Sequence, residues 1–270
     1  MIYVARDYQV DALRAHAIEG GSGYPILLIH GSGPGASTMG NWRRVLDPLA
    51  ERFRVHATDL IGFGQSARKS VPPFFDLQLW LRQCEALLAQ IDAPRVGILA
   101  HSLSAVLALR LAARHKKVAQ VLATGAMGTR FLVNEATASV WTFPKDREAL
   151  RKTAESLVFD RSLIDDAYLD ARMAILHGDN SYEPYFSAMF AGDKQAFIDS
   201  SLLDADELAN VGCPVVLMHG REDVAFPPSV TLELAKQLPQ ADVALLGRCS
   251  HSVAMEYPEK LLSAACQLFR

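Results

Sequence analysis

Several features are scarce in this sequence, and each absence narrows the possible functions. The 270 residues contain four cysteines, with no Cys-x-x-Cys pair and too low a density for a disulfide framework, so we expect reduced thiols and no zinc or other metal site. No apolar run reaches the roughly 18 residues that a membrane-spanning helix needs. The N-terminal stretch MIYVARDYQV lacks the basic-then-apolar order of a signal peptide. We therefore expect a cytoplasmic protein with no membrane attachment.

An excess of charge of one sign is also lacking. The 27 Lys and Arg residues face 30 Asp and Glu residues, and the basic residues are spread along the chain without a stripe or tail. Because nucleic acids bind concentrated positive charge, we expect no nucleic-acid partner. Hydrophobic residues make up 50% of the chain, which is enough to fill a sizeable core. The expected protein is globular, with one large domain and an insertion.

Short apolar runs alternate with longer helical patterns through most of the chain. This alternation predicts an α/β fold, a mostly parallel central sheet flanked by helices. Several of the predicted strands end in His or Asp, at the sheet edge where α/β proteins place their sites. The predicted strands are residues 25–30, 54–59, 96–101, 118–125, 214–220 and 242–247.

The alternation stops between residues 133 and 204. Aromatic and charged residues mix there, helix-like stretches such as LIDDAYLDARMAIL occur, and no strand run is comparable. We predict a helical cap at 133–204, inserted into a core domain formed by residues 1–132 and 205–270. The candidates for closing this cap over a pocket are Trp141, Tyr182, Phe186 and Phe190.

The stretch VGILAHSLSAVLALRL places Ser102 between a strand-like run and a helix-like run. A sharp strand-to-helix turn strains its central residue and needs small residues two positions to either side, here Ala100 and Ser104. Such a turn points the serine outward as a nucleophile. The alternative is that Ser102 only caps the following helix, since serine is a favoured N-cap residue.

A serine nucleophile needs a base, and the base needs an acid that fixes its tautomer. After this kind of turn the acid comes next along the chain, and the histidine follows. VVLMHGREDVAFPP supplies Asp223 and VALLGRCSHSVAMEYPEKL supplies His251, each just past a predicted strand. Taken alone, Asp223 suits an ordinary turn and His251 a structural histidine. Their order and placement favour a catalytic triad of Ser102, Asp223 and His251.

The loop IHGSGPGAS follows the strand at 25–30. Its glycines, Gly31 and Gly33 among them, let the backbone come close to a ligand. Backbone N–H groups stabilise the oxyanion that forms during nucleophilic attack, and we assign the two donors to Ser32 and Leu103. Without its neighbours, HGSGPG also suits a phosphate loop, but the Lys and Ser/Thr that end such a loop are absent.

Together these motifs resemble the α/β-hydrolase family over residues 25–270. Within that family, HGSGPGAS, DLIGFGQS and LVFDRSLIDDAYLDAR resemble the meta-cleavage product hydrolases, such as the 2-hydroxymuconic semialdehyde hydrolases. The resemblance implies an α/β-hydrolase fold with a helical cap and no cofactor. It implies cleavage of a carbon–carbon bond in a ring-opened aromatic compound of the 2-hydroxy-6-oxo-dienoate type. The expected partner is a small-molecule substrate that carries a carboxylate.

The resemblance also implies roles in substrate binding. Arg172 matches the partner of the substrate's carboxylate or dienolate end, and Asn41 matches a nearby polar contact. Tyr168, Arg172 and Ile175 share one helical face, so the guanidinium projects from an apolar stripe and needs an anion. We expect Asp59 of DLIGFGQS to stabilise a turn rather than to act as a second acid. The alternative for Arg172 is a surface position, paired with Asp166, Asp170 or Glu183.

Two departures from the family pattern affect the predicted pocket. His101 stands where an asparagine usually contacts substrate, and Ser252 stands where a tryptophan commonly follows the catalytic histidine. Two alternatives therefore remain: a carboxylesterase or amide hydrolase for a small acid-bearing substrate, and a ligand receptor on a hydrolase fold. The sequence leaves open whether the serine attacks the substrate or His251 activates water, and whether the chain forms a homodimer.

Overall fold

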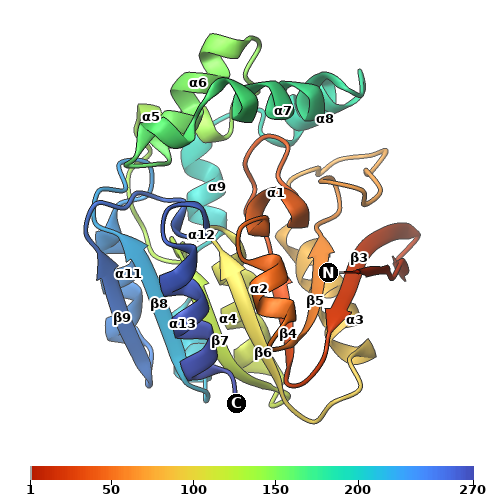
Figure 1. Ribbon diagram of the computed structural model, residues 1–270, viewed down its shortest axis with the longest axis vertical. Helices are drawn as coiled ribbons and strands as arrows, with labels where there is room; N and C mark the ends of the chain where they lie inside the picture. The colour runs from red at the N-terminus through yellow and green to blue at the C-terminus, as the bar shows by residue number, and fades with distance from the viewer. Residues whose placement is uncertain (1) are drawn as a thin grey trace.

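A mostly parallel sheet lies at the centre of the structure, a computed structural model that describes residues 2–270 (Figure 1). Nine strands of the described chain form it, in the order β1-β3-β5-β4-β6-β7-β8-β9, with β2 paired to β3 off this path. Strands β4 to β9 are parallel, and β3 is antiparallel to β5. The predicted α/β fold class is therefore confirmed. The strands are β1 Val4–Ala5, β2 Tyr8–Val10, β3 Leu13–Gly21, β4 Pro25–Ile29, β5 Arg54–Asp59, β6 Val96–His101, β7 Val118–Thr124, β8 Val215–Gly220 and β9 Ala241–Leu246.

The six predicted strands are β4 to β9, and their bounds agree within one residue at each end. Inner strands of this kind are near-continuous apolar runs because a parallel strand is buried on both faces. Strands β1 to β3 were not predicted. In β3, Arg14, His16 and Glu19 interrupt the apolar residues, so no comparable run marks it.

Helices cover both faces of the sheet, and the buried side chains form two hydrophobic cores. On one face α3, α4 and α11 bury Trp80, Leu107 and Leu234. On the other face α2 and α13 bury Leu49 and Leu261. The helices outside residues 133–204 are α1 Thr38–Trp42, α2 Leu46–Ala50, α3 Leu77–Gln90, α4 Ser104–Arg114, α10 Ala205–Ala209, α11 Pro228–Gln237, α12 Val253–Glu256 and α13 Pro258–Leu268.

Residues 133–204, here called the cap segment, connect β7 to β8 through α10. All of these residues are described, and their regular elements are helical. Figure 1 shows α5 to α8 above one edge of the sheet. Since β7 leads into this segment, that edge holds the carboxyl ends of the parallel strands. The elements are α5 Glu135–Val140, α6 Arg147–Ser156, the 3₁₀ turn η1 Arg161–Leu163, α7 Asp166–His177, α8 Tyr182–Met189 and α9 Lys194–Ser200.

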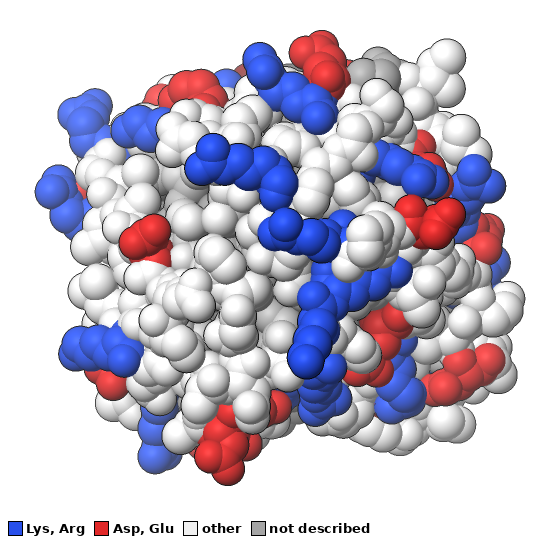
Figure 2. All heavy atoms as spheres, turned by 90° about the horizontal axis from the view of Figure 1, so that it is seen from below, with Lys and Arg blue, Asp and Glu red and all other residues white. Residues whose placement is uncertain are grey.

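The opposite side of the molecule carries charges of both signs. Seen from below, basic side chains form one run near the middle of this face, and acidic side chains lie beside it (Figure 2). Large areas of the same face carry neither. Within residues 2–270, no helix combines the length and the hydrophobicity needed to cross a bilayer.

Asp59 is the last residue of β5, and its carboxylate accepts hydrogen bonds from two loops near the sheet edge. Its Oδ1 accepts a hydrogen bond from the N–H of Thr38 at 2.7 Å, and its Oδ2 accepts one from the N–H of Gln65 at 2.8 Å. Gly64 has a φ of +51°, and a Cβ there would lie 2.1 Å from Oδ2 of Asp59. Only glycine fits that close approach. Asp59 thus stabilises a turn, as expected.

We predict that Asp59→Ala lowers the free energy of unfolding by about 2–4 kcal/mol, because it leaves two N–H groups without an acceptor. Urea denaturation at neutral pH measures the change. Asp92→Ala is the matched control, since Asp92 is exposed and its change is expected to stay within about 0.5 kcal/mol. Equal stability of the two variants would contradict the role of Asp59.

Candidate active site

Ser102 occupies a strained turn between β6 and α4. Its φ is +59°, a region that non-glycine residues rarely adopt. The N–H of Ser102 donates to the carbonyl of Thr124 at 2.9 Å, and its carbonyl accepts from the N–H of Ala105 at 3.0 Å. The residue that caps α4 is Leu103, and no side chain supplies a capping hydrogen bond. The alternative role of Ser102 as a helix cap is therefore excluded.

The small residues on either side of this turn are both buried. Ala100 and Ser104 are at most 1% exposed, which leaves no room for larger side chains. The hydroxyl of Ser104 donates to the carbonyl of His30 at 2.5 Å. Ser104 therefore connects the turn to the loop that follows β4.

His251 and Asp223 form a buried pair behind this turn. Nδ1 of His251 lies 2.7 Å from Oδ2 of Asp223. An ionised carboxylate only accepts hydrogen bonds, so Nδ1 carries the proton. In the neutral imidazole this leaves the lone pair on Nε2, the atom that a general base uses to accept a proton.

The carboxylate of Asp223 is fully occupied by donors. Oδ1 accepts from the N–H groups of Ala225 at 3.1 Å and Phe226 at 2.8 Å, and Nε2 of His219 lies 3.1 Å from Oδ2. Burial raises the pKa of Asp223, but the nearby His251 and the hydrogen bond from His219 outweigh it, so the pKa lies well below its usual range. Asp223 is therefore ionised at neutral pH.

His219 was not assigned a role from the sequence. It is fully buried at the end of β8, and its Nδ1 lies 2.6 Å from the hydroxyl of Thr231. Its Nε2 also lies 2.9 Å from the carbonyl of Phe226, so Nε2 carries the proton and donates to both oxygens. The sequence feature that could have indicated this role is the position of His219 near the end of a predicted strand.

Two rings hold the imidazole of His251. The ring of Phe226 stacks on it with centroids 4.4 Å apart, and the ring of His101 lies 4.7 Å away. Gly125 has a φ of +55°, and a Cβ there would lie 2.8 Å from Nδ1 of His251. The position of the ring is therefore fixed by packing on several sides.

His101 precedes the serine and is held in one tautomer. Its Nδ1 lies 3.1 Å from the carbonyl oxygen and 2.9 Å from the hydroxyl of Thr124. Since the carbonyl only accepts, Nδ1 is the donor and Nε2 keeps a lone pair. Burial, and then the proximity of His251, hold the pKa of His101 well below its usual range. His101 is therefore a neutral hydrogen-bond acceptor.

The loop after β4 begins at a fixed histidine. Nε2 of His30 accepts from the N–H of Leu60 at 2.9 Å, and Nδ1 donates to the carbonyl of Gly31 at 2.6 Å. The hydroxyl of Ser32 accepts from Nε1 of Trp141 at 3.1 Å. Among the hydrogen bonds within residues 2–270, none uses the N–H of Ser32 or of Leu103 as donor. Both amides are buried, and their role as oxyanion donors stays a prediction.

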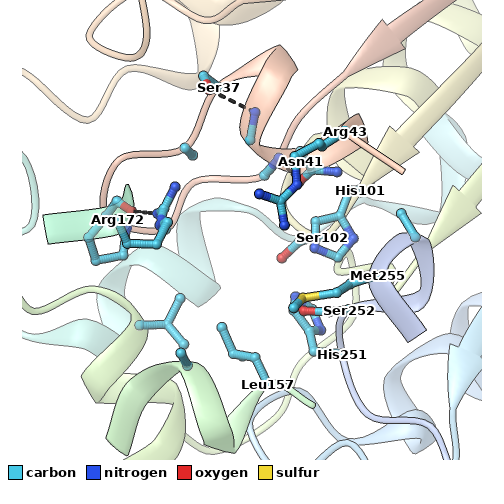
Figure 3. Close-up of a pocket in the computed structure, with 18 of the residues that line it drawn as sticks. Ser37, Asn41, Arg43, His101, Ser102, Leu157, Arg172, His251, Ser252 and Met255 are labelled. Atoms are coloured by element: carbon cyan, nitrogen blue, oxygen red, sulfur yellow. Dashed lines mark hydrogen bonds between the residues drawn. The ribbon is translucent and has the colours of Figure 1, made fainter. Parts of the chain in front are cut away.

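A cavity of about 400 Å³ collects most of the predicted site residues (Figure 3). Asp223 lies behind His251 and does not line it, nor does Leu103. No hydrogen bond joins the hydroxyl of Ser102 to His251 within the described chain. Such bonds often form only with substrate bound. The predicted residues that line the cavity are Gly31, Ser32, Gly33, Asn41, His101, Ser102, Arg172 and His251.

The cavity lining is cationic. Arg43, Arg44 and Arg172 contribute to it, and none of the described lining residues is Asp or Glu. An anion therefore meets favourable charge without a competing carboxylate. Among residues 2–270, no group of three or more His, Cys, Asp or Glu side chains is arranged to hold a metal ion.

The aromatic residues predicted to close the pocket lie elsewhere. Trp141, Tyr182, Phe186 and Phe190 are at most 5% exposed and none lines the cavity, so that expectation is wrong. Trp141 stacks on Phe190 with centroids 5.8 Å apart, and Phe186 lies 4.9 Å from Phe190. The rings pack together between the cap segment and the sheet. The cap residues that line the cavity are Val140, Leu150, Thr153, Ala154, Leu157, Tyr168, Ala171, Arg172 and Ile175.

Arg172 lies on the cavity side of α7 but donates to backbone. Its Nη1 donates to the carbonyl of Gly35 at 3.0 Å and its Nη2 to the carbonyl of Pro34. The predicted alternative ion pairs do not form within the described chain: Asp166 and Asp170 pair with Arg147 instead. The role of Arg172 toward a substrate acid stays a prediction.

Comparisons with known proteins agree with this fold. 2-Hydroxymuconate semialdehyde hydrolase of Pseudomonas sp. (strain CF600) is 29% identical over 263 residues, which are 96% of this chain and 92% of that protein. 2-Hydroxy-6-oxo-2,4-heptadienoate hydrolase of Pseudomonas putida is 27% identical and covers 87% of this chain and 85% of its own. The crystal structure of a mutant meta-cleavage product hydrolase superposes with a TM-score of 0.92 at 27% identity, covering 98% of each chain.

A family model agrees with these similarities. The model described as the alpha/beta hydrolase family matches residues 26–265. That match covers the strands β5 to β9, all of β4 but its first residue, the Ser102 turn and the cap segment. The resemblance to meta-cleavage product hydrolases extends over nearly the whole chain. The chain is a hydrolase that belongs to the α/β-hydrolase family.

Proposed function

We propose that this protein hydrolyses a carbon–carbon bond in a ring-opened aromatic compound, a 2-hydroxy-6-oxo-dienoate that carries a carboxylate. The observation that carries the proposal is the pairing of His251 with Asp223, beside a strained Ser102, in a cavity that is cationic. The relatives named above supply the bond type and the substrate class.

In the proposed reaction His251 acts as the base. Its Nε2 removes the proton of the Ser102 hydroxyl while Oγ attacks the 6-oxo carbon of the substrate. Asp223 holds the ring in the required tautomer and stabilises the imidazolium that forms. The N–H groups of Ser32 and Leu103 receive the negative charge that develops on the substrate oxygen.

Bond cleavage and hydrolysis follow. Before the attack, the proton of the substrate's 2-hydroxyl moves to C5, so that C2 becomes a ketone. The bond between C5 and the 6-oxo carbon then breaks, its electron pair is delocalised to the 2-oxygen as a dienolate, and that oxygen takes the proton held by His251. Water, deprotonated by His251, then releases the acid from Ser102. In the alternative course His251 activates water that attacks the substrate directly. Both courses consume one water and yield a hydroxy-dienoate and a carboxylic acid.

A second candidate is a carboxylesterase or amide hydrolase with the same residues. The residue that motivates this second candidate is His101. It lines the cavity as a neutral hydrogen-bond acceptor, where the carbon–carbon hydrolases usually have an asparagine, so the contact with the substrate differs there. Turnover distinguishes the candidates: loss of visible absorbance of the dienoate reports carbon–carbon cleavage, and release of nitrophenol reports ester cleavage. A ligand receptor would bind without turning over either substrate.

We predict that Ser102→Ala and His251→Ala each lower kcat by about 10³–10⁶-fold, since each removes a reacting group. Folding should be retained, as circular dichroism would verify. His177→Ala, a change at an exposed histidine of α7, is the control and should leave kcat unaltered. If Ser102→Ala retained more than a tenth of the turnover on the best substrate, the serine would not be the nucleophile.

We predict that Asp223→Asn lowers kcat by about 10³–10⁴-fold, because an amide cannot hold the His251 tautomer. The variant should also lose stability at neutral pH. Because its pKa is lowered in the folded state, ionised Asp223 stabilises the fold at any pH above its unfolded-state pKa of about 3.9. This stabilisation is lost as the pH falls through the folded-state pKa. Urea denaturation of both proteins across acidic pH should therefore show their stabilities converging. A constant difference would contradict the linkage.

A further inference from the structure

The carboxylate of Glu256 joins two loops that are distant in the sequence. Glu256 is the last residue of α12, and its Oε1 accepts hydrogen bonds from the N–H groups of Phe159 at 2.7 Å and Asp160 at 3.1 Å. Its Oε2 accepts one from the N–H of Ser250 at 2.7 Å. One side chain therefore satisfies three backbone donors, two in the cap segment and one in the residue before His251.

The cap side of this junction is the stretch 157–160, here called the cap loop, which connects α6 to η1. It also contacts the chain on both sides of the predicted base directly. The N–H of Ser252 donates to the carbonyl of Leu157 at 3.0 Å (Figure 3). The guanidinium carbon of Arg248 lies 5.1 Å from the centre of the Phe159 ring. These contacts hold the cap loop against the loop that follows β9.

The loop that follows β9, residues 247–252, is here called the histidine loop, and it is also fixed from the core. Cys249 exchanges two hydrogen bonds with Glu222: its N–H donates to Oε2 at 3.1 Å, and its carbonyl accepts from the N–H of Glu222 at 3.0 Å. A Cβ at Gly220 would lie 2.0 Å from the carbonyl oxygen of Ser250, so the loop packs directly on the end of β8. The histidine loop is therefore held between β8 on one side and the cap loop on the other.

The position of the histidine loop decides where the base lies. Asp223 and the stacked rings fix the plane and one nitrogen of the His251 imidazole, but the distance from Nε2 to Ser102 depends on the backbone of the loop. Ser250 is the residue before His251 and is 1% exposed, so no solvent is at hand to replace the acceptor of its N–H. A displacement of about 1 Å can cost about 100-fold in rate.

We propose that Glu256 is a positioning residue for catalysis. By accepting hydrogen bonds from Ser250 and from the cap loop at once, it braces the histidine loop against the cap segment. This bracing holds His251 at the position from which it reaches Ser102. Glu256 does not line the cavity, so it acts through the loop and not on the substrate. The inference rests on the proposed function only for the role of His251 as the base, and not on which bond is cleaved.

The variant Glu256→Gln tests this role with little change in size. The amide keeps one oxygen acceptor at the same reach but presents an NH₂ group to the remaining donors, so it cannot hold both loops. We expect kcat to fall about 10- to 100-fold on a dienoate and on para-nitrophenyl acetate, with KM changed by less than about threefold. Glu256→Ala removes both oxygens and should lower kcat further. Glu259→Gln, at an exposed glutamate of α13, is the matched control and should change neither constant.

A resonance of the His251 ring separates positioning from folding. The Nδ1 proton, which lies in the 2.7 Å hydrogen bond to Asp223, should give a proton NMR signal far downfield of the backbone amides, and its loss in His251→Ala assigns it. In Glu256→Gln this signal should broaden or disappear, because a displaced ring lets the proton exchange with water. Circular dichroism and urea denaturation verify the folded fraction. Lower stability with wild-type kcat and an unchanged signal would show a merely structural role and overturn the proposal.

Hydrogen exchange measures the junction itself and needs no turnover. In Glu256→Gln, peptides that contain the cap loop and the histidine loop should exchange about 10-fold faster than in wild type, while those of β6 and β8 stay protected. Unchanged exchange in both loops, or equal acceleration across the sheet, would overturn the proposal. Failure to cleave any dienoate would overturn the carbon–carbon proposal alone, because exchange and the ring signal report on Glu256 without substrate.

Discussion

The strained turn at Ser102 is the constraint on which the rest of the site depends. A positive φ at a non-glycine residue costs about 1–3 kcal/mol and persists only where the surroundings dictate it. Here a hydrogen bond to Thr124 of the neighbouring strand fixes one side, and the start of α4 fixes the other. Because the turn sits at the carboxyl end of β6, Ser102 lies at the same sheet edge as the loops that follow β4, β8 and β9.

At this sheet edge, hydrogen bonds keep the negative charge of Asp223 apart from the positively charged cavity lining. Asp223 receives donors on both oxygens and stays ionised away from the cavity, whereas His101 is neutral. Negative charge is thus confined behind His251, where it supports the base, and the cavity itself contains arginines. A carboxylate among the lining residues would compete with an anionic substrate for the same guanidinium groups.

The features that could be predicted from the sequence were those set by residues close together in the chain. Buried parallel strands are continuous apolar runs, so β4 to β9 were found, and the serine, acid and histidine follow strand ends in a fixed order. Strand β3, which is antiparallel to β5, has polar residues alternating with small ones. It therefore contains no continuous apolar run and was not predicted. The partners of His219 and Arg172 lie up to 138 residues away or across a turn, so no spacing could reveal them.

The misplaced aromatic residues of the cap segment illustrate a related limit. An apolar helical face must be buried, but the pattern does not say whether it meets a cavity or another helix. In and next to α5 and α8 the large rings are buried in the hydrophobic core, whereas smaller side chains of the cap segment, such as Val140 and Leu157, line the cavity. The rings therefore anchor the cap, and that anchoring lets Arg172 and Tyr182 hold the loop at Gly35. The cap segment thus contacts the backbone of the loop after β4 as well as lining the pocket.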